Sequence, residues 1–170
     1  MLILLTCLAL SLCLYAALND IATLTIPNWL NLSLVVLGLA ALFIAGPGFE
    51  ATVWHVTVAL AALAISFVLF MLGVWGGGDA KMVPAVLLWI GPAGVLPFAT
   101  WMVVSGGVLA LILIVARRAL PAERHPRFFA ESLKPGAGAP YGVAIAAGTF
   151  MAMPASPVFA DFLTVVSALH

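Results

Sequence analysis

Two aspartates, Asp20 and Asp79, are the residues of this chain best suited to chemistry. Each lies at the edge of an apolar run, and an aspartate at membrane depth costs roughly 2.5–3.5 kcal/mol to insert. Two carboxylates held close together share one proton, because both cannot ionise at once. The ionised one can take a proton from water, and the protonated one can donate to a carbonyl. The pair predicts amide hydrolysis, although each aspartate would also serve simply to end a helix at the water interface.

Three consecutive glycines, Gly76, Gly77 and Gly78, stand directly before Asp79. Because glycine has no Cβ, a substrate backbone can approach it closely and unusual backbone dihedrals cost little. A peptide bond inside a transmembrane helix is shielded by its own hydrogen bonds, so it must be held extended to be cut. We interpret the three glycines as a substrate-binding strip.

The surroundings of the two aspartates suggest which one is ionised. Asp20 ends the first predicted helix and Asp79 begins the fourth, so the helix dipoles favour Asp79 as the ionised base and Asp20 as the protonated acid. Lys81 is either a membrane anchor on the positively charged side or a nearby cation that favours the ionised form of Asp79. Asn28 follows Pro27, and we favour it as the cap of the second helix.

The composition predicts an integral membrane protein. Of 170 residues, 65% are hydrophobic and only 7% are charged, whereas soluble domains have about a quarter charged residues. We therefore expect one membrane domain over residues 1–170, in contact with the lipid bilayer. The formal net charge is zero, which gives no indication of nucleic-acid binding. No CxxC, HExxH or Ser-His-Asp pattern occurs, so we expect neither a metal nor another cofactor.

Six apolar runs predict six transmembrane helices, since about 20 apolar residues cross a bilayer. The fourth is long enough only if it starts near Asp79. Prolines 154 and 157 leave open whether residues 154–170 complete the sixth span or lie in the interface. A hydrophilic loop, Arg117–Ala139, precedes the last run, and a short amphipathic helix within it stays open. The predicted spans are Met1–Leu18, Trp29–Ala45, Trp54–Leu72, Met82–Ile90, Val95–Ala116 and Pro140–Met153.

The basic residues predict the orientation. With the N-terminus outside, the inside loops are residues 19–28, 73–81 and 117–139, and these contain all six Lys and Arg residues. Cytoplasmic loops carry the excess of Lys and Arg, so both aspartates are expected at the cytoplasmic face. The first nineteen residues lack a positively charged start, and we interpret them as a retained span rather than a signal peptide.

Three segments resemble the type IV prepilin peptidases, a family of GxGD intramembrane aspartic proteases. They are "DIATLTIPNWLN" (Asp20–Asn31), "GGGDAKM" (Gly76–Met82) and "PYGVAIAAG" (Pro140–Gly148), in the family's order. The resemblance implies a GxGD protease-like bundle in the bacterial inner membrane, with Asp20 and Asp79 as the catalytic pair. It implies prepilins or pseudopilins as partners, with a short basic leader, a glycine before the cut and an apolar helix after it.

One difference from larger members of the family indicates which subgroup this chain resembles. Larger members of the family carry paired CxxC motifs linked to N-methylation, and this chain has none. A peptidase-only member, like those of tight-adherence (Flp) pilus systems, fits better, and archaeal preflagellin peptidases remain an alternative. Two other functions stay open from the residues alone: a small transporter or proton-conducting protein that uses paired carboxylates, and a scaffold subunit of a secretion or pilus complex.

Overall fold

The computed structural model describes residues 1–119, 126–134 and 136–159, and within them every regular element is helical. The prediction of an all-α membrane protein is confirmed. The elements are α1 (Leu2–Thr23), α2 (Asn28–Ala45), α3 (Phe49–Met71), α4 (Gly77–Ile90), η1 (Pro92–Gly94), α5 (Val95–Ala119), η3 (Arg127–Phe129), α6 (Ala130–Leu133), α7 (Tyr141–Ala152), η4 (Met153–Ala155) and η5 (Pro157–Phe159).

Four helices, α1, α2, α3 and α5, are long and apolar enough to cross a membrane. They correspond to the first, second, third and fifth predicted spans. The third begins earlier than predicted, at Phe49 rather than Trp54. The reason is a tight turn, in which Gly46 and Gly48 take positive φ angles of 55° and 94°. Only glycine adopts such angles freely, so three residues suffice to reverse the chain.

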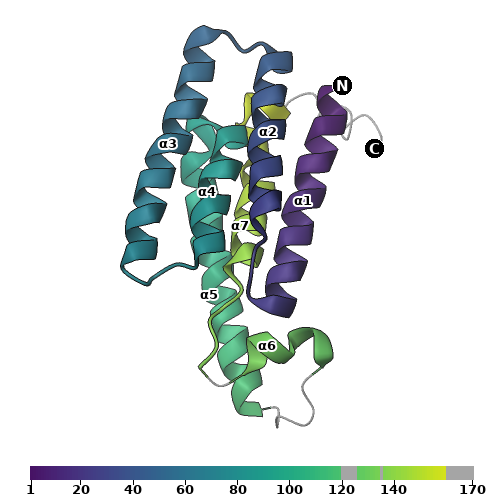
Figure 1. Cartoon of the computed structure of the whole chain (residues 1–170), viewed down its shortest axis with the longest axis vertical. Helices are drawn as coiled ribbons and strands as arrows, with labels where there is room; N and C mark the ends of the chain where they lie inside the picture. The colour runs from purple at the N-terminus through teal and green to yellow at the C-terminus, as the bar shows by residue number, and fades with distance from the viewer. Residues whose placement is uncertain (120–125, 135, 160–170) are drawn as a thin grey trace.

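Helix α4 is short and lies at the centre of the bundle. Its 14 residues rise about 21 Å, less than the roughly 30 Å of a hydrocarbon core. Every residue from Met82 to Ile90 is buried, because α2, α3 and α7 pack around it (Figure 1). The helix begins at Gly77, close to Asp79, but this start does not make it long enough to cross the membrane, and it is not among the four helices that can.

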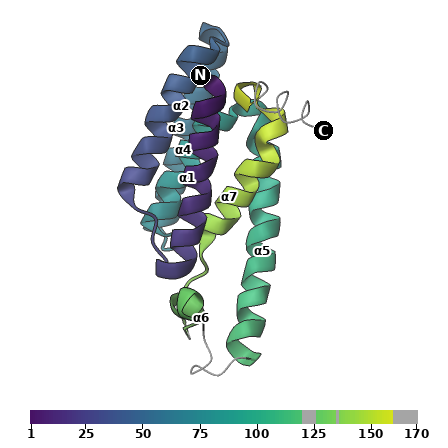
Figure 2. The same ribbon diagram turned by 90° about the vertical axis from the view of Figure 1, so that its right-hand side faces the viewer.

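Helix α7 forms the other short inner element. It packs mainly against α5 and α1, and Figure 2 shows it between these two helices. Two 3-10 turns, η4 and η5, continue the chain to Phe159. Whether residues 154–170 complete the sixth span was left open by the sequence, and residues 160–170 lie outside the described residues.

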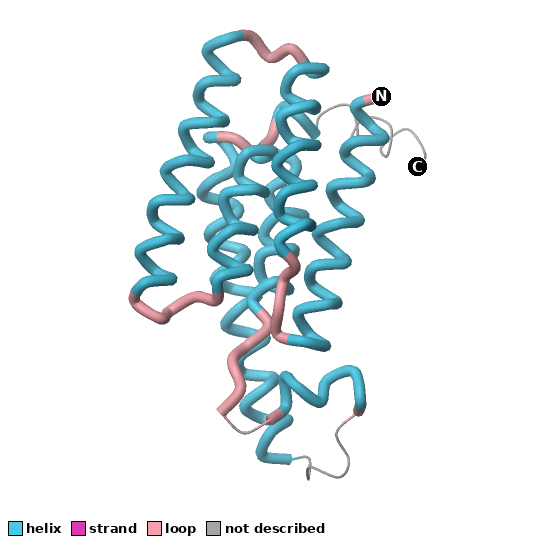
Figure 3. The backbone as a smooth tube through the Cα atoms, in the orientation of Figure 1, coloured by secondary structure: helices cyan, strands magenta, loops and turns pink. Residues whose placement is uncertain are grey.

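The connections predicted to face the cytoplasm gather at one end of the bundle. The α1–α2 and α3–α4 connections and α6 lie at the lower end in Figure 3, whereas the α2–α3 turn lies at the upper end. Within the hydrophilic segment, η3 and α6 form a short helical stretch, so the predicted loop is partly helical. The segments predicted to share one membrane face therefore share one end of the fold.

Polar contacts fix the C-terminal end of α4, whose last carbonyls lack partners within the helix. The Leu88 carbonyl bonds His55 Nδ1 at 2.9 Å, and the Trp89 carbonyl accepts from Ser156 Oγ at 2.9 Å. The Trp89 ring in turn donates from Nε1 to the Leu34 carbonyl of α2 at 2.9 Å. These bonds hold α4 in register with the helices around it.

Gly38 of α2 packs directly beneath the Trp89 ring, where a Cβ would lie 2.9 Å from Nε1. We expect Gly38→Ala to lower the thermal unfolding midpoint in detergent, because Trp89 is buried and hydrogen-bonded and cannot move aside. Overpacking of this kind costs about 1–3 kcal/mol. Gly107→Ala on α5 is the matched control, since a Cβ there meets nothing within 4 Å. An unfolding midpoint for Gly38→Ala equal to that of the control would show that this contact is not tight.

Candidate active site

Asp20 lies in the last turn of α1 and is buried, with 4% of its surface exposed. Its Oδ2 accepts a 2.7 Å hydrogen bond from the backbone N–H of Gly142, the second residue of α7. Backbone N–H groups at a helix N-terminus have no partner within the helix and attract negative charge. The carboxylate of α1 therefore closes the free end of α7, across 122 residues of sequence.

Asp79 lies in the first turn of α4. Its carboxylate accepts a backbone hydrogen bond from Gly76, the residue that caps the helix. A side chain at this third helical position can reach back to the cap in this way. The other oxygen, Oδ1, is buried and has no hydrogen-bond partner among the described residues. Asp79 thus keeps one acceptor unused inside the bundle.

Ile26 brings the two aspartates together. A Cβ at Gly78 would lie 2.9 Å from Ile26 Cβ, and a Cβ at Gly142 would lie 3.2 Å from Ile26 Cδ1. The start of α4 and the start of α7 therefore press against the same side chain. Asp79 follows Gly78 and Asp20 bonds Gly142, so both carboxylates lie around Ile26. The structure brings together the two residues that the sequence singled out.

The three glycines serve close packing within the chain. Cβ atoms at Gly76, Gly77 and Gly78 would meet Asp79 Oδ2 at 3.0 Å, the Phe70 ring at 3.4 Å and Ile26 Cβ at 2.9 Å, respectively. None of the three has a positive φ, so the expectation of unusual dihedrals is wrong. Gly77 and Gly78 begin a regular helix, which already has ordinary φ and ψ. Whether substrate also approaches this strip stays a prediction.

Lys81 and Asn28 form a pair of their own. Lys81 Nζ donates a 2.8 Å hydrogen bond to Asn28 Oδ1, and α2 has no side-chain cap. The interpretation of Asn28 as a cap is therefore wrong, because Lys81 engages its acceptor oxygen. No ion pair between Lys81 and Asp79 occurs among the described residues. The role of Lys81 in tuning the aspartates stays a prediction, with its cation directed toward α2.

The geometry also changes the basis for assigning acid and base. The first helix was expected to present its negative end to Asp20, yet the carboxylate contacts the positive end of α7 through Gly142. Hydrogen bonds from N–H groups are stronger to an ionised carboxylate than to a neutral one. Both aspartates thus lie at helix N-termini, and the dipole argument no longer separates them.

Asn31 is a site residue that the sequence reasoning missed. It is buried in α2, with 5% of its surface exposed, and its Nδ2 donates to the Gly78 carbonyl at 3.3 Å. Its Oδ1 has no partner among the described residues. Asn31 therefore ties α2 to the residue before Asp79. The sequence feature that could have identified Asn31 is its position three residues after Asn28, on the same helix face, in an otherwise apolar span.

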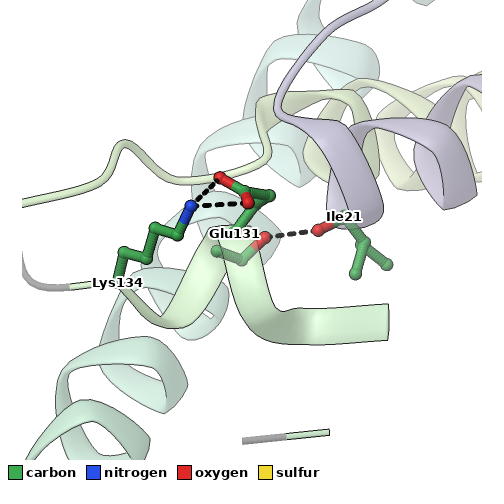
Figure 4. Close-up of polar contacts among 4 residues, drawn as sticks. Ile21, Glu131 and Lys134 are labelled. Atoms are coloured by element: carbon green, nitrogen blue, oxygen red, sulfur yellow. Dashed lines mark hydrogen bonds and ion pairs between the residues drawn. The ribbon is translucent and has the colours of Figure 1, made fainter. Parts of the chain in front are cut away.

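The hydrophilic segment braces the end of α1 that carries Asp20. Ser132 Oγ of α6 donates to the Ile21 carbonyl at 2.6 Å, and Figure 4 shows Ile21 facing α6 beside Glu131 and Lys134. Arg117 of α5 donates to the carbonyls of Ser132, Ala137 and Gly138 at 2.7–3.1 Å. A hydrogen bond to a charged group contributes about 1.5–3 kcal/mol. The segment therefore contacts both α1 and α5. The sequence left a short helix within this loop open, but it did not predict these contacts.

Comparison with known proteins gives the class of this site. A family model described as the type IV leader peptidase family matches residues 7–111. The chain belongs to the type IV leader peptidase family. The matched region contains both aspartates and the three glycines, while Gly142 lies beyond it. Searches of curated proteins and of solved structures returned no match.

No three His, Cys, Asp or Glu side chains gather as a metal-binding group within residues 1–119, 126–134 and 136–159. The polar groups around Ile26 are instead two carboxylates, backbone N–H groups and the amide of Asn31. This set can donate, accept and transfer protons.

Gly142 offers a test of the contact between Asp20 and α7. A Cβ at this position would lie 3.0 Å from both Cβ and Oδ2 of Asp20. We expect Gly142→Ala to displace the Asp20 carboxylate and to lower peptidase activity by about tenfold, since a displacement of 1 Å can cost about a hundredfold. Activity is measured on a leader-bearing precursor. Gly138→Ala, where a Cβ meets nothing within 4 Å, should cleave at the wild-type rate. Unchanged cleavage by Gly142→Ala would remove this contact from the account.

Proposed function

We propose that this leader peptidase is an aspartic endopeptidase that removes the leader from type IV prepilins of the Flp type at the cytoplasmic membrane face. The observation that carries the proposal is the placement of Asp20 and Asp79 around Ile26, each at the N-terminal end of a helix. The family match supports a peptidase activity, and the two carboxylates support an aspartic mechanism for it.

The proposed cycle begins with one proton shared between the two aspartates. The ionised carboxylate removes a proton from water, whose oxygen attacks the carbonyl carbon of the scissile amide. The protonated carboxyl donates its proton to the carbonyl oxygen, which gives a tetrahedral diol. The carboxyl that took a proton from water then gives it to the amide nitrogen, and the C–N bond breaks. A diol hydroxyl returns a proton to the other carboxylate. The products are a carboxyl on the leader and an amine on the pilin, with the dyad restored.

The surroundings support this division of labour. Asp79 Oδ1 is an acceptor without a protein partner, which suits it to receive a proton from water. Asp20 Oδ2 is held by Gly142, so its other oxygen is the one available to a substrate carbonyl. Gly76 is exposed, and we place the approach of the substrate backbone beside it, because Gly77 and Gly78 are packed against Phe70 and Ile26.

The orientation in the membrane follows from charge. Lys81, Arg117, Arg118 and Lys134 all belong to segments at the end of the bundle that carries the aspartates. Basic residues mark the cytoplasmic side, so we propose that this end faces the cytoplasm of a bacterial inner membrane, with the N-terminus outside. A basic leader would then meet the site from the cytoplasm while the pilin helix stays in the bilayer.

The direct test is cleavage of a co-expressed Flp-type prepilin, followed by the mobility shift on a gel. Asp20→Asn and Asp79→Asn should each abolish the shift, because an amide can neither accept the proton of water nor share one. Glu131→Gln is the matched control, since Glu131 pairs with Lys134 at 2.6 Å on the exposed surface. Substantial cleavage by either asparagine variant would exclude the dyad, and failure of the wild type on this precursor would exclude the substrate.

The orientation is tested separately by cysteine labelling. In a background that lacks Cys7 and Cys13, Glu50→Cys and Lys134→Cys should react with an impermeant thiol reagent from opposite sides of the membrane. Lys134→Cys should label only from the cytoplasm, because its segment carries the basic residues. Both positions are exposed, so a missing signal is not due to burial. Labelling of both from one side would overturn the proposed topology.

A further inference from the structure

An apolar groove runs between α2 and α3, with α4 as its floor. The two outer helices pack on α4 rather than on each other, which leaves a cavity of about 460 Å³ that opens to the outside of the bundle. Its walls and floor are lined by the apolar residues Leu32, Val35, Leu39, Val56, Ala59, Leu60, Leu63, Pro84, Ala85 and Leu88. In a bilayer such a surface is in contact with hydrocarbon.

One end of the groove is polar and positively charged. Asn28, Asn31 and Lys81 line it there, and Asn28 holds the exposed Lys81 ammonium through a 2.8 Å hydrogen bond. Lys81 has no carboxylate partner among the described residues, where the one ion pair joins Lys134 to Glu131. The cation therefore lies at the polar mouth of an apolar groove, and no carboxylate within residues 1–119, 126–134 and 136–159 pairs with it.

The groove offers room for a thin occupant. It has a volume of about 460 Å³ and runs along the roughly 16 Å that α2 rises from Asn28 to Leu39. A single extended hydrocarbon chain can lie along it.

The two aspartates of the proposed catalytic site do not line the groove, and Asp20 faces α7 rather than α3. The groove reaches the site only at its polar end, through Asn31. There the Lys81 ammonium would attract an anionic group. Charge and shape thus indicate the same class of ligand, a hydrocarbon chain with a negatively charged head.

We propose that the groove between α2, α3 and α4 binds one acyl chain of an anionic phospholipid, whose phosphate contacts Lys81. A basic residue near the membrane surface contributes about 1 kcal/mol toward anionic lipid, and basic pockets between helices on the cytoplasmic side are known lipid sites. Apolar burial of the chain supplies the remaining affinity. The bound lipid would fill the space that separates α2 from α3.

The test is native mass spectrometry of the purified protein titrated with phosphatidylglycerol and with phosphatidylethanolamine of the same acyl chains. The wild type should bind one phosphatidylglycerol about fivefold more tightly than phosphatidylethanolamine, which corresponds to about 1 kcal/mol. Lys81→Gln should lose this preference and Lys81→Arg should keep it. Lys134→Gln, which removes a cation outside the groove, should bind as the wild type does.

A second pair of variants tests the groove itself. Ala59→Phe places a ring in the groove from α3 and should lower the binding of both lipids, whereas Ala61→Phe, on an exposed position of α3 that does not line the groove, should leave it unchanged. Equal binding of the two lipids by the wild type would overturn the proposal. So would an unchanged preference in Lys81→Gln, or wild-type binding by Ala59→Phe.

Discussion

The hydrogen bond from Gly142 N–H to Asp20 Oδ2 is the contact on which the candidate site depends. A carboxylate inside an apolar bundle is costly unless it is paired or hydrogen-bonded. Here the free N–H groups at the start of α7 meet that need without any cation. Asp79 is half-buried at the start of α4, where Gly76 donates to its carboxylate while Oδ1 has no partner among the described residues. One buried and one half-buried acid thus each meet a helix N-terminus.

The close approach of these helix ends explains the small residues around them. Gly78 and Gly142 both contact Ile26, and a side chain at either position would push the two aspartates apart. Asn31 holds the Gly78 carbonyl from α2, and Ser132 holds the end of α1 through the Ile21 carbonyl. Helices that are distant in sequence therefore hold the two aspartates in place. The short central helix α4 contributes to this, because its buried part from Met82 to Ile90 is fixed by α2, α3 and α7.

The sequence predicts the parts of this arrangement that depend on local pattern. Apolar runs locate α1, α2, α3 and α5, and the motif around Asp79 locates the start of α4. The sequence does not predict that Lys81 donates a hydrogen bond to Asn28. Local preference favours Asn28 as the cap of α2, and only the packing of α2 on α4 brings Lys81 within reach. The contact of Asp20 with Gly142 spans 122 residues, and helix-dipole reasoning applied to α1 alone therefore pointed in the opposite direction.

The most direct measurement of the central claim is the binding of a precursor peptide whose scissile amide is replaced by a hydroxyl-bearing carbon. Such an analogue mimics the tetrahedral diol, and analogues of a transition state bind at least a hundredfold more tightly than substrate. The account predicts tight binding by the wild type, measured by calorimetry in detergent, and its loss in both Asp20→Asn and Asp79→Asn. Binding of the analogue by either asparagine variant with wild-type affinity would contradict a dyad formed by these two residues.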